Sequence, residues 1–409
     1  MFDRDRWEEI FQTIAKNRLR TFLSGFTVAL GIFIFVILFG LGNGLKNTFQ
    51  EFFLDDATNI IRLYPGNTSK PYKGYKTGRN IQFTNEDVEA IEKAFPQYVD
   101  YLTVRIYRNG EVRYGTHSNS YSVRGTSPEH LFAENTIIMK GRYLNYSDIA
   151  NAEKHAVIGR LVEKDLFEEE DAIGKYIRIR GSTFKVIGVF QDQAGDNEER
   201  NIYAPYSTVQ LLDGGHEYVD QIIVAFKPTL SYGTVLMFAE ELNKYMRERL
   251  IIHPDDNGGI YLRNVAKDYQ QNQQFATVLQ IIVSFVGLGT LIAGIIGISN
   301  IMVFVIKERT KELGIRKALG ATPSSIIGMV LQESILITIV SGYLGLMAGV
   351  GVLSWVGDTL KPYFIRNPEI DLGTALGATI ILIICGGIAG YIPARRAAKI
   401  KPIVALRDE

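Results

Sequence analysis

The chain has 409 residues, and its 44 basic residues balance its 44 acidic residues. This neutrality gives no reason to expect a nucleic acid or a strongly charged substrate as its partner. The average hides two unlike parts, because long apolar stretches alternate with polar ones. The single cysteine, Cys385, lies in an apolar stretch, so disulfide bonds are excluded from the polar part.

Four apolar stretches are long enough to cross a lipid bilayer. Three of them contain no charged residue, and the remaining one, 326–356, contains only Glu333. A helix needs about 20 apolar residues to cross a hydrocarbon core of about 30 Å. The first stretch is too long for a cleaved signal peptide and is expected to remain as an anchor. The sequence therefore predicts an α-helical membrane protein with four transmembrane helices, at 21–45, 275–306, 326–356 and 372–394.

Lysine and arginine fall unevenly between these helices. They gather in the head, in the turn after the second helix and in the tail, whereas the connection between the third and fourth helices holds only Lys361 and Arg366. Cytoplasmic flanks collect positive charge. The segments expected in the cytoplasm are therefore 1–20, 307–325 and 395–409. The segments expected outside are 46–274 and the short loop 357–371.

The head, residues 1–20, carries a helical pattern. Trp7, Ile10, Phe11 and Ile14 recur at helical spacing, while charged residues occupy the other faces. This pattern predicts an amphipathic helix on the inner membrane surface. A helix packed on its neighbours is the alternative, and both place the head beside the turn 307–325.

The exterior part, 46–274, opens and closes with similar patterns of strand, helix and strand. Thr84, three residues before Asp87, is a capping signal for a helix that ends at Pro96. Asn109-Gly110 predicts a β-hairpin turn, because both of its turn positions favour a positive φ. The strands expected in the opening and closing sections are 59–64, 104–108, 111–114, 221–226 and 260–265, with a second helix at 234–250.

The middle of the exterior part, about 123–218, has a different pattern. Residues 176–180 alternate apolar and polar side chains, Gly181-Ser182 turns the chain, and 184–190 returns it, which predicts a second hairpin. We therefore expect a two-lobed α/β subdomain built from both ends of the exterior part, with an inserted β-rich subdomain.

The second helix is longer than a bilayer requires. As a single helix, 275–306 reaches about 48 Å at about 1.5 Å per residue, so part of it must project outward as a stalk. The first helix likewise continues past Leu45 into apolar residues at helical spacing. In the alternative, breaks near Asn47 and Asn272 end both helices at the membrane surface.

Small residues inside the helices predict close packing rather than a polar pathway. Pairs of them recur at four-residue spacing, which lets helix backbones approach one another. Such positions are Gly289, Ala293 and Gly297, Gly345 with Gly349, Gly373 with Gly377, and Gly386 with Gly390. Glu333 is open to a functional interpretation, but its place near the cytoplasmic turn favours contact with water or a neighbouring helix.

The sequence contains no catalytic signature. It lacks a phosphate-binding loop with its glycines and lysine, a zinc-protease H-E-x-x-H and a G-x-S-x-G nucleophile motif. Its five histidines are scattered singly, which does not favour a metal site. We therefore expect no enzymatic activity, no metal and no cofactor in this chain, so that any energy comes through a partner.

Two segments of the helical part carry a resemblance to a known family. KERTKELGIRKALGATPSSI after the second helix, and the tail beginning at Pro393 with PARRAA, resemble the signature segments of the MacB/FtsX-like ABC transporter permease family. The exterior sequences VRGTSPEHLF, HAVIGRLVEKDLF and AIGKYIRIRGSTFKVIGVF are similar to the MacB-type periplasmic core domain. Unlike MacB itself, this sequence has only about twenty residues ahead of the first helix.

The resemblance implies a function and a set of partners. It implies a homodimer in the inner membrane bound to separately encoded ABC ATP-binding subunits, which hold the ATP. It also implies that motion of these subunits is passed to the exterior domain by mechanotransmission, to drive export. The residues of 307–325 that match the family's coupling segment are Glu308, Arg309, Glu312, Gly314, Arg316, Lys317, Gly320 and Ala321.

Members of this family have more than one function. Export with a periplasmic adaptor and an outer-membrane channel is the main expectation. A non-transporting module of the FtsX type, which activates a partner such as a cell-wall hydrolase or a sensor, is the alternative, and lipoprotein extraction is a third. The exterior surface carries no sequence pattern that chooses between them.

Overall fold

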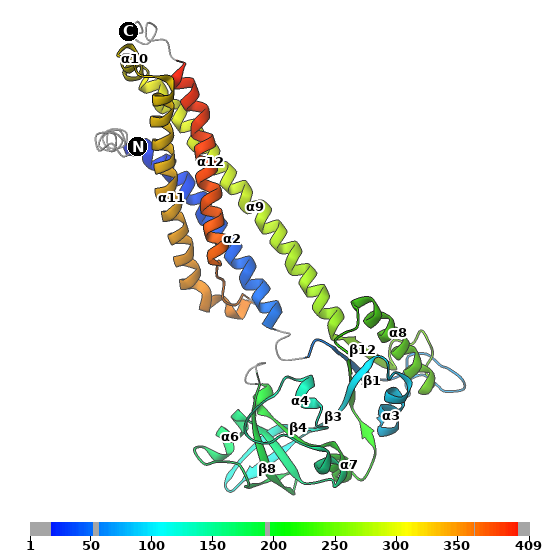
Figure 1. Cartoon of the computed structure of the whole chain (residues 1–409). Helices are drawn as coiled ribbons and strands as arrows, with labels where there is room; N and C mark the ends of the chain where they lie inside the picture. Colours follow the sequence, from blue (N-terminus) through cyan, green and yellow to red (C-terminus); the bar gives the residue numbers. More distant parts are fainter. Residues whose placement is uncertain (1–17, 52–56, 193–196, 364, 400–409) are drawn as a thin grey trace. The chain divides into compact units, whose positions relative to one another are not determined.

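A computed structural model describes residues 18–51, 57–192, 197–363 and 365–399. The chain divides into two compact units (Figure 1). The helical unit comprises Met1–Phe49 and Gln274–Glu409, and the exterior unit comprises Gln50–Gln273. The expected amphipathic helix at the head lies outside the described residues except for its last three positions.

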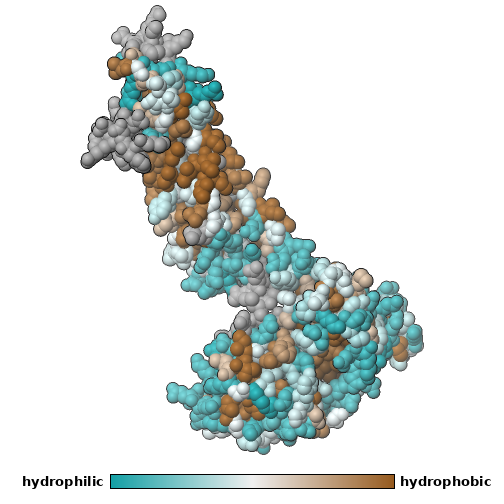
Figure 2. All heavy atoms as spheres, in the orientation of Figure 1, coloured by the Kyte–Doolittle hydropathy of each residue, from teal (hydrophilic) through white to brown (hydrophobic). Residues whose placement is uncertain are grey.

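The helical unit contains four helices that can span a membrane, as the sequence predicts. By length and composition the candidate spans are Thr21–Thr48, Val265–Glu308, Pro323–Tyr363 and Gly373–Ala398. The helices run alongside one another in Figure 1, and in Figure 2 hydrophobic side chains cover the middle of this unit. Its elements are α2 (Arg18–Glu51), α9 (Val265–Glu308), α10 (Thr310–Ala318), α11 (Pro323–Leu360), the short 3-10 helix η2 (Lys361–Tyr363) and α12 (Leu372–Ala398).

Glycines set the close approach of these helices. A Cβ atom at Gly345 would lie 2.3 Å from the carbonyl oxygen of Ala29, so α11 and α2 meet backbone to backbone there. At Gly390 a Cβ atom would lie 2.6 Å from Oγ of Ser334, which brings α12 against α11. A Cβ atom at Gly289 would have open space around it. The small-residue spacing therefore marks real contacts at Gly345 and Gly390, but not at Gly289.

Helices α2 and α9 pass without a break through Asn47 and Asn272. The alternative in which both helices end at these positions is therefore wrong. Helix α9 has 44 residues, which is about 66 Å at about 1.5 Å per residue. It is much longer than a crossing of the hydrocarbon core requires.

The exterior unit is a mixed α/β fold around one large sheet. The sheet order is β12-β1-β11-β3-β4-β9-β6-β8-β5, with β7 pairing with β3 and β8. Its strands are β1 (Ile60–Pro65), β3 (Val99–Tyr114), β4 (His117–Thr126), β5 (Ile137–Gly141), β6 (His155–Gly159), β7 (Tyr176–Ile179), β8 (Ser182–Gln191), β9 (Asn201–Pro205), β11 (Gln221–Phe226) and β12 (Ile260–Asn264). A small second sheet pairs β2 (Phe83–Thr84) with β10 (Tyr218–Val219).

Helices cover this sheet. They are α3 (Asn85–Ala94), α4 (His130–Ala133), α5 (Tyr146–Ala150), α6 (Arg160–Phe167), α7 (Tyr206–Leu212) and α8 (Tyr232–Arg249), with the 3-10 helix η1 (Glu198–Arg200). The predicted capping signal is present, since the backbone N–H of Thr84 donates to Oδ2 of Asp87 at 2.9 Å. Strands from both ends of the unit lie together as β12-β1-β11 beside β3, as expected. In its described residues the middle region carries four α-helices, α4 to α7, and the 3-10 helix η1 besides its strands, and it shares the same sheet.

The predicted hairpin at Asn109-Gly110 is wrong. Both residues lie inside β3, where Gly110 pairs with Tyr121 of β4, and the chain turns only at Gly115, whose φ is +55°. A Cβ atom at Gly110 would lie 2.5 Å from Cγ of Arg180. This glycine therefore serves a close approach inside the sheet, not a turn. The second predicted hairpin is present as β7 and β8.

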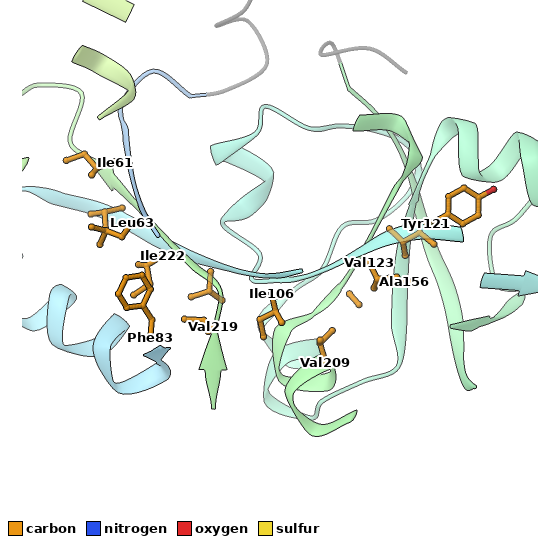
Figure 3. Close-up of a cluster of buried hydrophobic side chains, with 14 of the residues drawn as sticks. Ile61, Leu63, Phe83, Ile106, Tyr121, Val123, Ala156, Val209, Val219 and Ile222 are labelled. Carbon is orange, nitrogen blue, oxygen red and sulfur yellow. The ribbon is translucent and has the colours of Figure 1, made fainter. Parts of the chain in front are cut away.

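A continuous hydrophobic core fixes the exterior unit. Side chains such as Ile61, Phe83, Ile106, Val123 and Ile222 are buried in one cluster that extends from the β1–β11 end of the sheet to β4 and β6 (Figure 3). Because one core serves both ends of the unit and its middle, the exterior unit is stabilised as a whole.

Candidate coupling site on the helical unit

The segment expected to couple to a partner forms a short helix, α10, between two long ones. Glu308 is the last residue of α9, Arg309 stands between α9 and α10, and Leu313 and Gly314 are buried. Glu308 and Lys311 are exposed. The turn predicted from the charges and glycines is therefore a helix with one buried and one exposed side.

The charges of α10 form an ion-pair network inside this chain. Nε of Arg309 lies 3.1 Å from Oε2 of Glu312, and Nη2 of Arg316 lies 2.9 Å from Oε1 of the same glutamate. Nη1 of Arg309 also lies 3.2 Å from Oε2 of Glu333 on α11. Arg309 therefore links the start of α10 to α11. Glu333, the glutamate inside the apolar stretch, contacts a neighbouring element, which is what the structural interpretation of this residue predicts.

Two further contacts fix α10 to the neighbouring helices. Nη1 of Arg316 lies 3.0 Å from Sδ of Met329 on α11. Nζ of Lys317 donates to the carbonyl oxygen of Ala398, the last residue of α12, at 2.6 Å. A cation at this position also interacts favourably with the negative end of the helix dipole. Through these contacts α10 is held to both α11 and α12.

The glycine after α10 ends the helix. Gly320 has a φ of +99°, in the left-handed region that favours glycine. Its N–H donates to the carbonyl oxygen of Lys317 at 3.1 Å, and the N–H of Ala321 donates to that of Arg316 at 3.0 Å. This pair of bonds is a Schellman motif. Thr322 then caps α11, whose first residue is Pro323.

The exposed side of α10 carries an apolar stripe. Ile315 is 44 % exposed and Leu319 is 83 % exposed, and with Lys311 they follow at four-residue spacing, which places them on one face of the helix. The sequence reasoning chose the charges and missed Ile315 and Leu319. The four-residue spacing could have indicated them, but only contacts distinguish an apolar residue that faces outward from one that packs inside.

The predicted coupling residues therefore occupy different environments. Arg309, Glu312 and Arg316 are engaged within the chain, and Gly314 is buried. Their role toward a partner stays a prediction. In the part of the chain that the structure describes, no cluster of three or more His, Cys, Asp or Glu side chains could hold a metal ion.

Comparison with known families assigns both units. Residues 21–237 match the family described as the MacB-like periplasmic core domain, and residues 284–402 match the FtsX-like permease C-terminal family. The chain belongs to the MacB/FtsX-like permease family. Most of the helical unit, including α10, thus lies in the residues that match the FtsX-like permease family. Most of the exterior unit of this permease lies in the residues that match the periplasmic core domain.

Known proteins resemble the permease over nearly its whole length. It is 29 % identical to the macrolide export ATP-binding/permease protein MacB of Wolinella succinogenes, over 98 % of this chain and 60 % of that protein. It is 28 % identical to the protein of the same name from Chlorobaculum tepidum, over 98 % of this chain and 61 % of that one. The chain thus spans about three fifths of the length of these relatives.

One solved structure matches part of the chain. The periplasmic region of MacB from Actinobacillus actinomycetemcomitans matches with a TM-score of 0.44 and 20 % sequence identity, over 53 % of this chain and 94 % of that one.

Proposed function

We propose that this permease passes the motion of a cytoplasmic ABC ATP-binding subunit to its exterior unit, to drive export of a substrate. The observation that carries the proposal is the pair formed by α10 and α9. Helix α10 presents an apolar stripe and is fixed to α11 and α12, while α9 is one unbroken helix from Val265, directly after β12, to Glu308.

The physical argument concerns stiffness. A helix keeps its length because every interior backbone N–H is bonded to a carbonyl oxygen one turn away. A push on a helix that is anchored by ion pairs and by a bond to α12 displaces the neighbouring helices together rather than bending a loop. We infer that α10 is the contact surface and that α9 is the rod that carries the displacement.

The proposed orientation and partners follow from charge and family. Head, α10 and tail face the cytoplasm of an inner-membrane protein, because these segments carry the clustered lysine and arginine. The permease acts as a homodimer together with an ABC ATP-binding subunit. A periplasmic adaptor and an outer-membrane channel complete the export path.

Export is favoured over the alternatives by the comparison. The relatives that match almost the whole chain carry macrolide export in their names. The substrate of this chain is not carried over from those names.

The first experiment tests the contact surface. The full chain is purified from its native host in lipid nanodiscs, and a co-purifying subunit with a phosphate-binding loop is sought by mass spectrometry. Leu319→Asp should abolish the association, because it places a charge at the most exposed residue of the apolar stripe. Leu211→Asp is the matched control, since Leu211 is also apolar and 61 % exposed but lies on α7 of the exterior unit.

The second experiment tests the rod. Asn272→Pro removes a backbone donor from α9 and breaks the helix, whereas Asn272→Ala preserves it. Hydrogen exchange in residues 57–273 is compared with and without a non-hydrolysable ATP analogue. We expect the nucleotide to change exchange in the wild type and the alanine variant but not in the proline variant. An unchanged nucleotide response in the proline variant would contradict mechanotransmission through α9.

A further inference from the structure

The exterior unit contains a groove of about 410 Å³, which lies in the range of small-molecule sites. Its lining comes from α3, the start of β3, the loop before α4, α5 and α7. Helix α3 belongs to the opening section of the unit, whereas α5 and α7 belong to its middle region. The groove thus lies where two sections of one unit meet, a common location for ligand sites.

Part of the groove wall is aromatic and aliphatic. Tyr101, Tyr146 and Tyr206 approach it from β3, α5 and α7, and Val88 and Ile149 contribute aliphatic surface. Tyrosine rings offer a large rigid contact area, and their faces attract cations. The lining therefore suits a ligand with a sizeable apolar body.

The charge of the groove has one sign. Glu89, Glu92, Asp100 and Glu129 line it, and no lysine or arginine is among the described lining residues. Within the described part of the chain, Glu92 and Asp100 make no ion pair and are exposed to solvent. Burial, together with the charges of Asp100, Glu134 and Glu129, raises the pKa of Tyr101 to about 12. A cation is therefore the complementary charge.

The groove is held in shape before any ligand enters. The side-chain amide of Asn85 on α3 donates to Oε1 of Gln210 on α7 at 3.2 Å, and that of Gln210 donates back at 3.0 Å. Oγ of Ser207 donates to the carbonyl oxygen of Ile149 at 2.6 Å, which ties α7 to α5. Preorganised walls lower the entropy cost of binding.

A metal ion does not fit this lining. Among the described residues no three carboxylate, histidine or cysteine side chains lie close enough together to hold one. Glu89 and Glu92 lie on α3, Asp100 lies on β3 and Glu129 lies just before α4. We propose that this groove binds an amphipathic organic cation, with its apolar body against the tyrosines and its positive group near Glu92 and Asp100. The inference deepens the proposed function by naming a substrate class, and its meaning as a transport site rests on that function.

The test measures binding alone. The full chain in phosphatidylcholine nanodiscs is dialysed against tetraphenylphosphonium, a bulky aromatic cation, and against tetraphenylborate, an anion of the same shape. We expect the cation to bind with at least tenfold higher affinity to protein-containing discs than the anion does, after subtraction of binding to empty discs. Equal binding of the two ions would overturn the proposal.

Matched variants locate the site. Glu92→Gln with Asp100→Asn should weaken binding of the cation by at least tenfold. Glu240→Gln with Glu241→Gln removes the same charge from exposed positions on α8, outside the groove, and should leave binding unchanged. Tyr146→Ala should also weaken binding, while Tyr232→Ala, another exposed tyrosine, should not. If the groove variants and their control variants weakened binding of the cation equally, the assignment of the site to this groove would be contradicted.

The outcome is separable from that of the coupling experiments. The groove variants should retain association with the ATP-binding subunit, because they do not touch α10. If binding fails while that association and the nucleotide response persist, the groove is not the site and the proposed function stands. If the cation binds as expected but no nucleotide response exists, the binding site stands and the transport interpretation fails.

Discussion

Arg309 and Glu333 are 24 positions apart in the chain, yet Nη1 of the arginine lies 3.2 Å from Oε2 of the glutamate. Both side chains are nearly removed from solvent, at 13 % and 7 % exposure. The same arginine also contacts Glu312. One guanidinium therefore fixes the start of α10 to α11.

Breaking this ion pair should loosen α10. Loss of one partner of a buried pair costs about 3–5 kcal/mol, because the other charge is left without compensation. We expect Glu333→Gln to accelerate hydrogen exchange in 309–319 of the full chain in nanodiscs. Asp358→Asn, at a carboxylate side chain that is 91 % exposed, is the control. Identical exchange in 309–319 for both variants would contradict a positioning role for Glu333.

Gly320 should resist replacement by any residue with a Cβ. Its φ of +99° lies where alanine is strained, so Gly320→Ala should destabilise the end of α10 by about 1 kcal/mol or more. Gly328 inside α11 has open space where a Cβ atom would lie, and Gly328→Ala should be neutral or slightly stabilising. Thermal unfolding in detergent compares the two. Equal melting temperatures would be inconsistent with the Schellman motif.

The contact of α11 with α2 should depend on Gly345. A Cβ atom there would meet backbone atoms of Ala29 at 2.3 Å and 2.9 Å, and backbone cannot rotate away as a side chain can. Overpacking of this kind costs about 1–3 kcal/mol. We expect Gly345→Ala to lower the melting temperature of the full chain, and Gly351→Ala, where nothing lies within 4 Å, to leave it unchanged. A neutral Gly345→Ala would show that α2 and α11 separate easily.

The exterior unit should become less stable as the pH decreases, because of His130. Nε of Arg105 donates to Nε2 of His130 at 2.7 Å, so the other ring nitrogen carries the proton toward Tyr143 Oη at 3.1 Å. Burial, with the charges of Arg105, Arg124 and Arg62, holds the pKa of His130 well below its usual range. The folded histidine is therefore neutral where the unfolded one becomes charged.

The sign of the effect follows from proton linkage. Below the unfolded pKa of about 6.5 the unfolded state binds the extra proton, so the free energy of unfolding falls by about 1.4 kcal/mol per pH unit from this group. Stability is thus fully present above that pH and lost as the pH decreases. Hydrogen exchange of β4 and α4 between pH 7 and pH 5 measures it. The slope should flatten in His130→Asn but not in His216→Asn, an exposed position; equal slopes would contradict a neutral buried histidine.

Local patterns predicted many elements well. The four helices follow from the length of their apolar stretches, and β11 matches its predicted range of Gln221–Phe226. The capping signal at Thr84 lies where the sequence places it. These features depend on neighbouring residues alone, so periodicity, capping chemistry and length contain the information.

The failures share a cause. Asn109-Gly110 resembles a turn locally, but the strand continues because β4 pairs along its whole length and Arg180 occupies the space that a Cβ atom would fill. The sequence also did not show that Arg309 and Arg316 contact Glu333 and Met329 on α11, whereas the role of these charges toward a partner stays a prediction. Contacts between residues distant in the chain decide these cases.

By itself the sequence determined that the protein has four membrane helices, a separate exterior domain and a charged turn with glycine breaks, because hydrophobic length and local backbone preference act over a few residues. Only the tertiary structure decided that α10 exposes Ile315 and Leu319, that Glu333 is neutralised by Arg309, and that a groove with tyrosines and carboxylates forms between α3, α5 and α7. The physical reason is that burial and electrostatic pairing depend on distances in space, which sequence separation does not specify.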